Sequence, residues 1–166
     1  MLEAYIVYEE EAEERFSAAR EILLRILKEF QIETEELCIM DGRDAKEYTK
    51  KLEDDSIKYI FSFDMAGFQM NTILEQPAYN LFKAIQMHIV VDERYFALYA
   101  NKEFALNLFF FVPGRIGEWK RKYPEVLNFI GYEYFATDWT GKIIDCCNNR
   151  EKLNRMVIEF MKEISG

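Results

Sequence analysis

The hydrophobic pattern of the chain consists of short apolar runs separated by longer stretches in which apolar residues recur with a helical period. The short runs are rich in β-branched and aromatic residues, which is typical of β-strands. They cover residues 4–8, 37–40, 59–63, 87–91, 106–112 and, less clearly, 131–135. The runs at 89–91 and 106–112 are nearly continuous in apolar residues rather than alternating, which indicates strands that are covered on both faces.

The stretches between these runs predict helices, because their apolar residues recur every three or four positions. In the stretch 12–30, Phe16, Leu23 and Leu27 fall on one face and charged residues on the other. Pro77 suits the first turn of another helix. The predicted helices cover residues 12–30, 45–52, 77–84, 94–101, 118–127 and 150–164. The segment 136–149 fits neither pattern.

Strands and helices that alternate in this way predict an α/β fold. We expect a doubly wound, mostly parallel sheet of five or six strands with helices on both faces, Rossmann-like or flavodoxin-like. The chain has 166 residues, no linker rich in Gly, Ser or Pro, and no internal repeat. We therefore expect residues 1–166 to form a single domain.

Charge and composition narrow the range of partners. Asp and Glu total 30 against 21 Lys and Arg, and the resulting net charge of -9 disfavours nucleic acid and anionic membrane surfaces. No apolar run reaches the roughly 20 residues of a membrane span, and Met1–Glu3 lacks the basic start of a signal peptide. The three cysteines, Cys38, Cys146 and Cys147, do not make a disulfide framework. We expect a cytoplasmic protein that binds neither nucleic acid nor a membrane; the role of Cys146 and Cys147 stays open.

The turn after the first strand argues against a nucleotide cofactor. In a doubly wound sheet, ligands bind beyond the carboxyl ends of the strands. A phosphate-binding turn there needs glycine and free helix N–H groups. Residues 9–14 contain five glutamates and no glycine. This pattern excludes a dinucleotide fingerprint and a P-loop, and we expect no cofactor.

The turns after the third and fourth strands hold candidate ligand-binding residues. Asp64 ends the third strand, where it can accept hydrogen bonds from a sugar hydroxyl, and Gly67 permits the close approach of a ligand. Asp92 closes the fourth strand and can pair with Asp64, in an arrangement that binds hard cations or acts as acid and base. The alternative is that these residues only cap helices and turn the backbone.

The fifth strand is followed by a third candidate turn. Gly114 and Arg115 belong to a Gly-x-x-Gly turn that can receive a phosphate or a carboxylate, although such turns are also common without a ligand. His88 is the only histidine and lies inside an apolar strand, so we expect a structural role for it. With no second histidine and with Cys146 adjacent to Cys147, a metal site is not expected. No catalytic residue can be assigned.

Aromatic residues are abundant, with 14 Phe, 10 Tyr and 2 Trp. So small a domain does not easily bury all of them, and we expect some to form an exposed apolar patch. The residues concerned are Tyr95, Phe96, Tyr99, Tyr132, Tyr134 and Phe135. Such a patch indicates a protein partner or a homo-oligomer.

Residues 58–135 resemble a known family. The resemblance is carried by Lys58–Phe68, Tyr79–Asn80, the strand Met87–Asp92 and Asn107–Phe111. These segments look like the N-terminal Rossmann-like half of CgeB-like, GT-B glycosyltransferase-like bacterial proteins, in which a strand and its turn are followed by a helix, a strand ending in Asp and a further strand. The resemblance implies one lobe of a two-lobed fold whose other lobe usually holds the nucleotide-sugar.

Three functional hypotheses follow. The favoured one is a non-catalytic binding or protein-interaction domain related to one lobe of a GT-B glycosyltransferase. The alternative is a small sugar-binding or nucleotide-sugar-binding enzyme, with Asp64, Asp92 and Arg115 near the ligand. A receiver-like signalling domain would match Glu9, Glu10 and Asp64, but the Thr or Ser and the Lys that it needs after the fourth and fifth strands are absent.

Overall fold

The computed structural model describes residues 1–40, 45–71, 75–132 and 150–165. Six strands form one sheet in the order β2-β1-β3-β4-β5-β6, and every neighbouring pair is parallel. Their bounds are β1 Ala4–Glu9, β2 Thr34–Ile39, β3 Tyr59–Phe63, β4 Ile85–Ile89, β5 Leu108–Pro113 and β6 Phe129–Tyr132. The order 2-1-3-4-5, extended here by a sixth strand, is that of the flavodoxin-like doubly wound sheet. The predicted α/β fold is confirmed.

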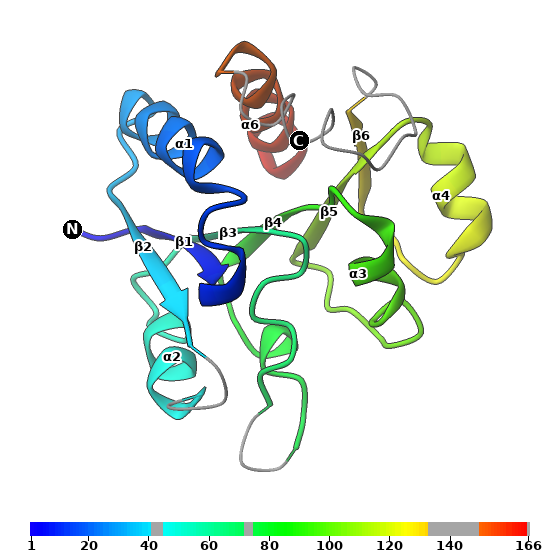
Figure 1. Cartoon of the computed structure of the whole chain (residues 1–166), viewed down its shortest axis with the longest axis horizontal. Helices are drawn as coiled ribbons and strands as arrows, with labels where there is room; N and C mark the ends of the chain where they lie inside the picture. The colour runs from blue at the N-terminus through cyan, green and yellow to red at the C-terminus, as the bar shows by residue number, and fades with distance from the viewer. Residues whose placement is uncertain (41–44, 72–74, 133–149, 166) are drawn as a thin grey trace.

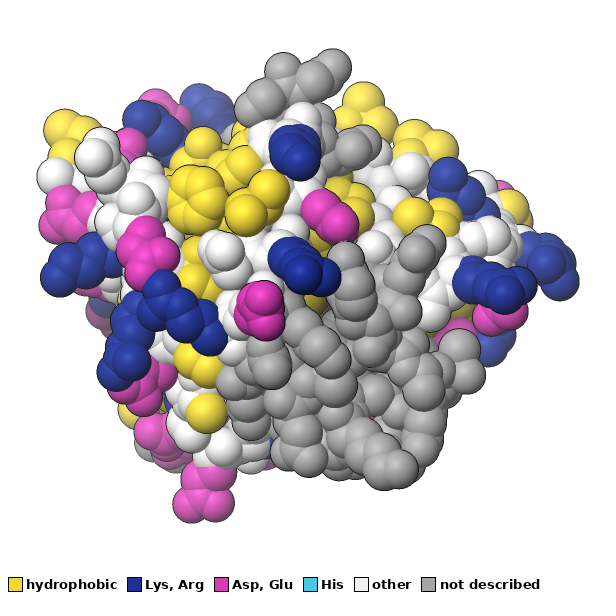
Figure 2. All heavy atoms as spheres, turned by 90° about the horizontal axis from the view of Figure 1, so that it is seen from above, with side chains coloured by type: hydrophobic (Ala, Val, Ile, Leu, Met, Phe, Trp, Pro, Cys, Tyr) yellow, Lys and Arg dark blue, Asp and Glu magenta, His cyan; other side chains and the backbone are white. Residues whose placement is uncertain are grey.

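Helices cover both faces of the sheet (Figure 1). On one face lie α1 (Ser17–Glu29) and α6 (Arg150–Ser165), which pack against each other. On the other face lie α2 (Ala45–Leu52), α3 (Glu93–Ala97) and α4 (Ile116–Lys122). Figure 2 looks onto the face of α1 and α6, where hydrophobic side chains gather among charged ones. None of the helices in the described ranges is both long and apolar enough to cross a membrane.

Alternate residues of each strand supply two separate hydrophobic clusters. In β1, Tyr5 and Val7 pack toward α2, α3 and α4, whereas Ala4 and Ile6 pack toward α1 and α6. In β5, Phe110 belongs to the first cluster and its neighbour Phe111 to the second. Because both faces of the sheet are buried, the inner strands are apolar at most positions, which explains the long apolar runs in the sequence.

The first helix begins later than residue 12. Residues Glu10–Ala12 form a 3-10 turn, and α1 begins only at Ser17. In a continuous helix the Glu13 carbonyl would accept the N–H of Ser17. It accepts instead a hydrogen bond from the Arg20 guanidinium at 2.9 Å. This contact keeps the segment before α1 out of the helix and beside the carboxyl end of β1.

The helix predicted at 77–84 is a single 3-10 turn, Ala78–Asn80. The Asn80 side chain donates to the Glu103 carbonyl at 2.7 Å and accepts from the Ala105 N–H at 2.8 Å. These contacts fix Asn80 as a turn residue, and β4 follows almost at once.

The helices predicted at 94–101 and 118–127 are α3 and α4, and both end earlier than predicted. For α4 the reason is local, because Tyr123 precedes Pro124 and a residue before proline is disfavoured in a helix. The predicted strand at 131–135 is β6, which begins at Phe129. Residues 133–149, with Tyr134, Phe135, Cys146 and Cys147, lie outside the described residues.

Candidate functional site

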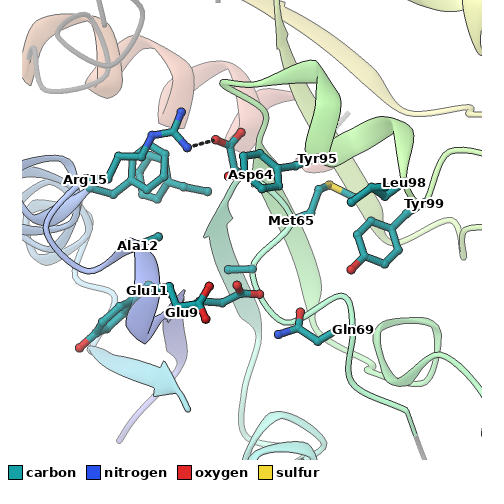
Figure 3. A pocket seen from close by; sticks show the side chains of 14 residues that line it. Glu9, Glu11, Ala12, Arg15, Asp64, Met65, Gln69, Tyr95, Leu98 and Tyr99 are labelled. Atoms are coloured by element: carbon teal, nitrogen blue, oxygen red, sulfur yellow. Dashed lines mark ion pairs between the residues drawn. The ribbon is translucent and has the colours of Figure 1, made fainter. Parts of the chain in front are cut away.

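A pocket of about 400 Å³ opens at the carboxyl ends of β1 and β3. These two strands are neighbours from which the chain winds outward in opposite directions, so the pocket lies at the topological switch point. The 14 side chains that line it come from the end of β1 and the segment after it, the end of β3 and its turn, and α3 with the residues that follow it (Figure 3). The fold therefore creates this pocket by bringing together three segments that are far apart in sequence.

Asp64 connects the ends of two strands and lines the pocket. Its Oδ1 accepts the backbone N–H groups of Val91 at 2.7 Å and Asp92 at 2.8 Å, directly beyond β4. Its Oδ2 lies 3.2 Å from a guanidinium nitrogen of Arg15, and no hydrogen bond from the described residues reaches this oxygen. Asp64 and Met65 both adopt left-handed backbone conformations, with φ of 47° and 62°. Left-handed backbone at a non-glycine residue such as Met65 carries strain, and strain of this kind is one of the features that cluster at functional sites.

The Asp64 carboxyl group is buried, with 5% of its side chain exposed. Burial raises its pKa from 3.8 to about 6, against the opposing effect of the two N–H donors and of Arg15. Since Oδ1 already accepts two hydrogen bonds, Oδ2 is the oxygen that takes up a proton. The titrating atom of Asp64 therefore faces Arg15 and the pocket.

Among the residues that the structure describes, Arg15 is the only cationic side chain in the lining of this pocket. Its guanidinium lies 5.0 Å from the centre of the Phe16 ring and 5.9 Å from that of Tyr95. Phe16 in turn stacks on Phe63 with 4.9 Å between ring centres. Two aromatic rings and the Asp64 carboxylate thus hold the Arg15 charge in place.

Glu9 and Glu11 supply two further carboxylates (Figure 3). Glu9 Oε1 accepts the N–H of Gly67 at 3.3 Å, which connects the end of β1 to the turn after β3. Gly67 has φ of +84°, and a Cβ atom there would lie 3.1 Å from Ile39 Cδ1. Burial, with a smaller contribution from the charge of Glu9, raises the pKa of Tyr99, so its hydroxyl remains a hydrogen-bond donor.

The structure places Asp92 next to Asp64 but not in the lining of the pocket. Its carboxylate caps α3 by accepting the Arg94 N–H at 3.0 Å, and it also binds the Arg94 guanidinium. The hydrogen bond from the Arg94 side chain lowers the pKa of Asp92. The two carboxylates therefore have different roles: Asp64 binds the backbone beyond β4 and lines the pocket, whereas Asp92 caps α3. No group of three or more His, Cys, Asp or Glu within the described ranges is placed to hold a metal ion.

Gly114 and Arg115 lie after β5, which β4 separates from β3. Gly114 has φ of 81°, and Arg115 is an exposed residue that precedes α4. Neither residue lines the pocket. The structure thus places Asp64 at the pocket, with Gly67 in contact with its lining, whereas the Gly114–Gly117 turn belongs to another part of the sheet edge.

His88 lies in the core, as its position inside an apolar strand predicts. Gln86 Oε1, which can only accept, lies 2.9 Å from Nε2, so this nitrogen carries the hydrogen and Nδ1 accepts from the Ser62 hydroxyl. The amide of Gln86 donates to the Tyr79 carbonyl at 2.8 Å. Burial lowers the pKa of His88 to about 3. The imidazole is a neutral part of a satisfied buried network.

The prediction that Phe96 belongs to an exposed aromatic patch is wrong. This side chain is fully buried and packs edge-on against Phe110 and Trp119. Tyr95 is 43% exposed and Tyr99 is half-buried, and both line the pocket.

Sequence reasoning missed Arg15 and Glu11 as parts of a site. One signal was present, because Arg15 is the first basic residue after a run of glutamates.

No protein-family model matches this chain, and a search of curated proteins finds no match.

Proposed function

We propose that this chain is a binding domain that takes a small hydroxylated molecule, in the first place a sugar, into the switch-point pocket. The observation that carries the proposal is the pocket itself. Its volume of about 400 Å³ falls within the range of small-molecule sites, and its place at the switch point is where doubly wound sheets bind ligands.

The chemistry of the lining supports a sugar. The aromatic rings of Tyr95 and Tyr99 offer apolar surface for the C–H groups of a sugar ring. The carboxylates of Glu9 and Glu11 offer acceptors for its hydroxyl groups. A few polar groups on a largely apolar lining are typical of such sites.

A nucleotide-sugar fits this pocket less well than a free sugar. Its diphosphate would meet three carboxylates and a single guanidinium that is already paired with Asp64. The resemblance to one lobe of a GT-B glycosyltransferase supports the same choice, since the other lobe of those proteins usually holds the nucleotide-sugar. We therefore propose that this chain corresponds to the lobe that binds the acceptor sugar, and that it is not catalytic by itself.

Isothermal titration of the whole chain with D-glucose and with UDP-glucose tests the proposal. We expect glucose to bind more tightly than UDP-glucose. Tyr99→Ala should weaken glucose binding roughly tenfold, which corresponds to about 1.4 kcal/mol. Tyr48→Ala, at a half-buried tyrosine of α2 outside the pocket, is the matched control and should leave binding unchanged. Binding of UDP-glucose alone would contradict the proposal.

The second candidate function is interaction with a protein, in the simplest case a second copy of this chain. Large apolar side chains favour it: Leu98 is 68% exposed, Leu106 71% and Leu127 67%. Leu106 and Leu127 precede the paired strands β5 and β6, where Asn128 Nδ2 donates to the Leu106 carbonyl at 2.7 Å. Light scattering should then give a mass above 19.9 kDa. A monomer at high protein concentration would contradict self-association.

A further inference from the structure

We propose that the ligand of the switch-point pocket carries an amino group in addition to hydroxyl groups, as an amino sugar does. This inference rests on the proposed function, since it names the chemical class of the ligand in the same pocket. It starts from the charges that the described residues bring to the lining, three carboxylates and one guanidinium.

The charges of the lining do not balance. Arg15 and Asp64 compensate each other at 3.2 Å. Among the described residues, no cation lies within ion-pair distance of the Glu9 or Glu11 carboxylate. Figure 3 shows these two carboxylates on the opposite side of the view from the Arg15–Asp64 ion pair. A pocket with an uncompensated negative end favours a ligand that brings a positive charge.

The Glu9 carboxylate is held ready for such a ligand. It is half-buried, and the N–H of Gly67 fixes its Oε1 at 3.3 Å. A carboxylate that is already oriented loses less side-chain entropy when a ligand binds. Glu11, on the 3-10 turn that follows β1, is exposed and closes the same end of the pocket.

A second feature, independent of Glu9 and Glu11, also favours a ligand rich in N–H and O–H donors. Asp64 Oδ2 is a buried acceptor that receives no hydrogen bond from the described residues, on a side chain that is only 5% exposed. Arg15 lies 3.2 Å away and compensates the charge of this oxygen without making a hydrogen bond to it, so an uncharged donor from a ligand would be stabilising there. A hydroxyl group of the ligand suits this atom, because a second cation would be repelled by Arg15, and the amino group is therefore expected at the end of the pocket formed by Glu9 and Glu11.

The walls of the pocket accept a cation as well. The rings of Phe16 and Tyr95 already bind the Arg15 guanidinium, so the ring that can take the cation of a ligand is that of Tyr99, which also lines the pocket. The competing cationic ligand is a divalent metal ion. The described residues offer no group of three or more side chains placed to hold one. A hydroxylated amine satisfies the carboxylates, the aromatic rings and the Asp64 acceptor together.

The experiment compares D-glucosamine, D-glucose and N-acetyl-D-glucosamine by isothermal titration of the whole chain at pH 6.5, where an aliphatic amine is protonated. We expect glucosamine to bind about tenfold more tightly than glucose, and the acetylated sugar to lose this advantage because it carries no charge. Added salt should weaken the binding of glucosamine and leave that of glucose unchanged.

Two neighbouring carboxylates provide a matched pair of variants. Glu11→Gln should weaken the binding of glucosamine much more than that of glucose, and so remove most of the preference, because the amide keeps an acceptor oxygen for a hydroxyl group but carries no charge. Glu10→Gln, at an exposed residue of the same turn that does not line the pocket, should keep the preference. Equal binding of the three sugars would overturn this inference and leave the proposed function standing. If none of the three sugars bound, the proposed function would fail as well.

Discussion

At the scale of single residues, Asp64 does more than end a strand. It joins the end of β3 to the backbone beyond β4, holds Arg15, and presents one buried oxygen to the pocket. A carboxyl group in this position makes the stability of the protein depend on pH. The dependence has the opposite sign to that of a carboxylate in a favourable ion pair, because burial outweighs the contribution of Arg15.

We expect Asp64→Asn to gain stability relative to the wild type as the pH rises. The folded pKa of about 6 lies above the ordinary 3.8, so between these values the folded state holds a proton that the unfolded chain has lost. Ionisation of Asp64 therefore lowers the free energy of unfolding by up to about 3 kcal/mol as the pH rises from 4 to 7. Asparagine does not titrate. Urea denaturation of both proteins at several pH values measures the difference, and a constant difference from pH 4 to pH 7 would show that Asp64 has an ordinary pKa.

The residues of the site differ in how far the sequence predicts them. Asp64 and Gly67 stand out as a turn after a buried strand, and the order of the sheet brings that turn to the switch point. Arg15 and Tyr99 could not be predicted in the same way. They reach Asp64 and Glu9 only through the packing of α1 and α3 on opposite faces of the sheet, and a local pattern carries no information on such contacts.

At the scale of elements, two glycines show that the local backbone conformation decides whether a substitution by alanine destabilises or stabilises the protein. Gly67 lies in the turn after β3 with a left-handed backbone, and a Cβ atom there would lie 3.1 Å from Ile39 Cδ1. Gly117 lies in the helix α4, and a Cβ atom there would meet nothing within 4 Å. The same substitution therefore has opposite expected effects at the two positions.

We expect Gly67→Ala to lower the free energy of unfolding by about 1–2 kcal/mol, since alanine is strained at positive φ. The added methyl group also presses on Ile39 and disturbs the N–H that binds Glu9. Gly117→Ala is the control and should raise the free energy of unfolding by up to about 1 kcal/mol, because alanine favours the helix. Urea denaturation measures both, and equal effects at the two sites would refute this account.

The strands were easier to predict than the helices. Burial on both faces requires continuous apolar runs, and these runs are visible in the sequence. Helix ends depend on contacts that the periodicity does not contain. The Arg20 hydrogen bond delays the start of α1, and the Asn80 contacts replace a helix with a turn.

At the scale of the whole molecule, one face of the sheet depends on two helices that come from opposite ends of the described chain. α6 lies beside α1 (Figure 1). Phe160 of α6 contacts the rings of Phe61 at 5.8 Å, Phe109 at 5.7 Å and Phe111 at 6.0 Å between ring centres. This side chain connects α6 to β3 and β5.

We expect Phe160→Ala to lower the free energy of unfolding by about 3–5 kcal/mol, as for other buried aromatic residues. Phe30→Ala, at a side chain that is 40% exposed, is the control and should cost about 1 kcal/mol or less. Urea denaturation followed by circular dichroism measures both. A loss at position 160 no larger than the loss at position 30 would mean that α6 does not complete the core.

The position of α6 also has a consequence for synthesis on the ribosome. Strands β1, β3, β4 and β5 all emerge before residues 150–165, so the nascent sheet has one face on which α1 is the only helix among the described residues that precede α6. Until α6 leaves the exit tunnel, Phe61 and Phe111 are open to water and to other nascent chains. Stable folding is therefore expected to begin only after translation has passed this helix, and chaperones that recognise exposed aromatic residues would bind this protein during that interval.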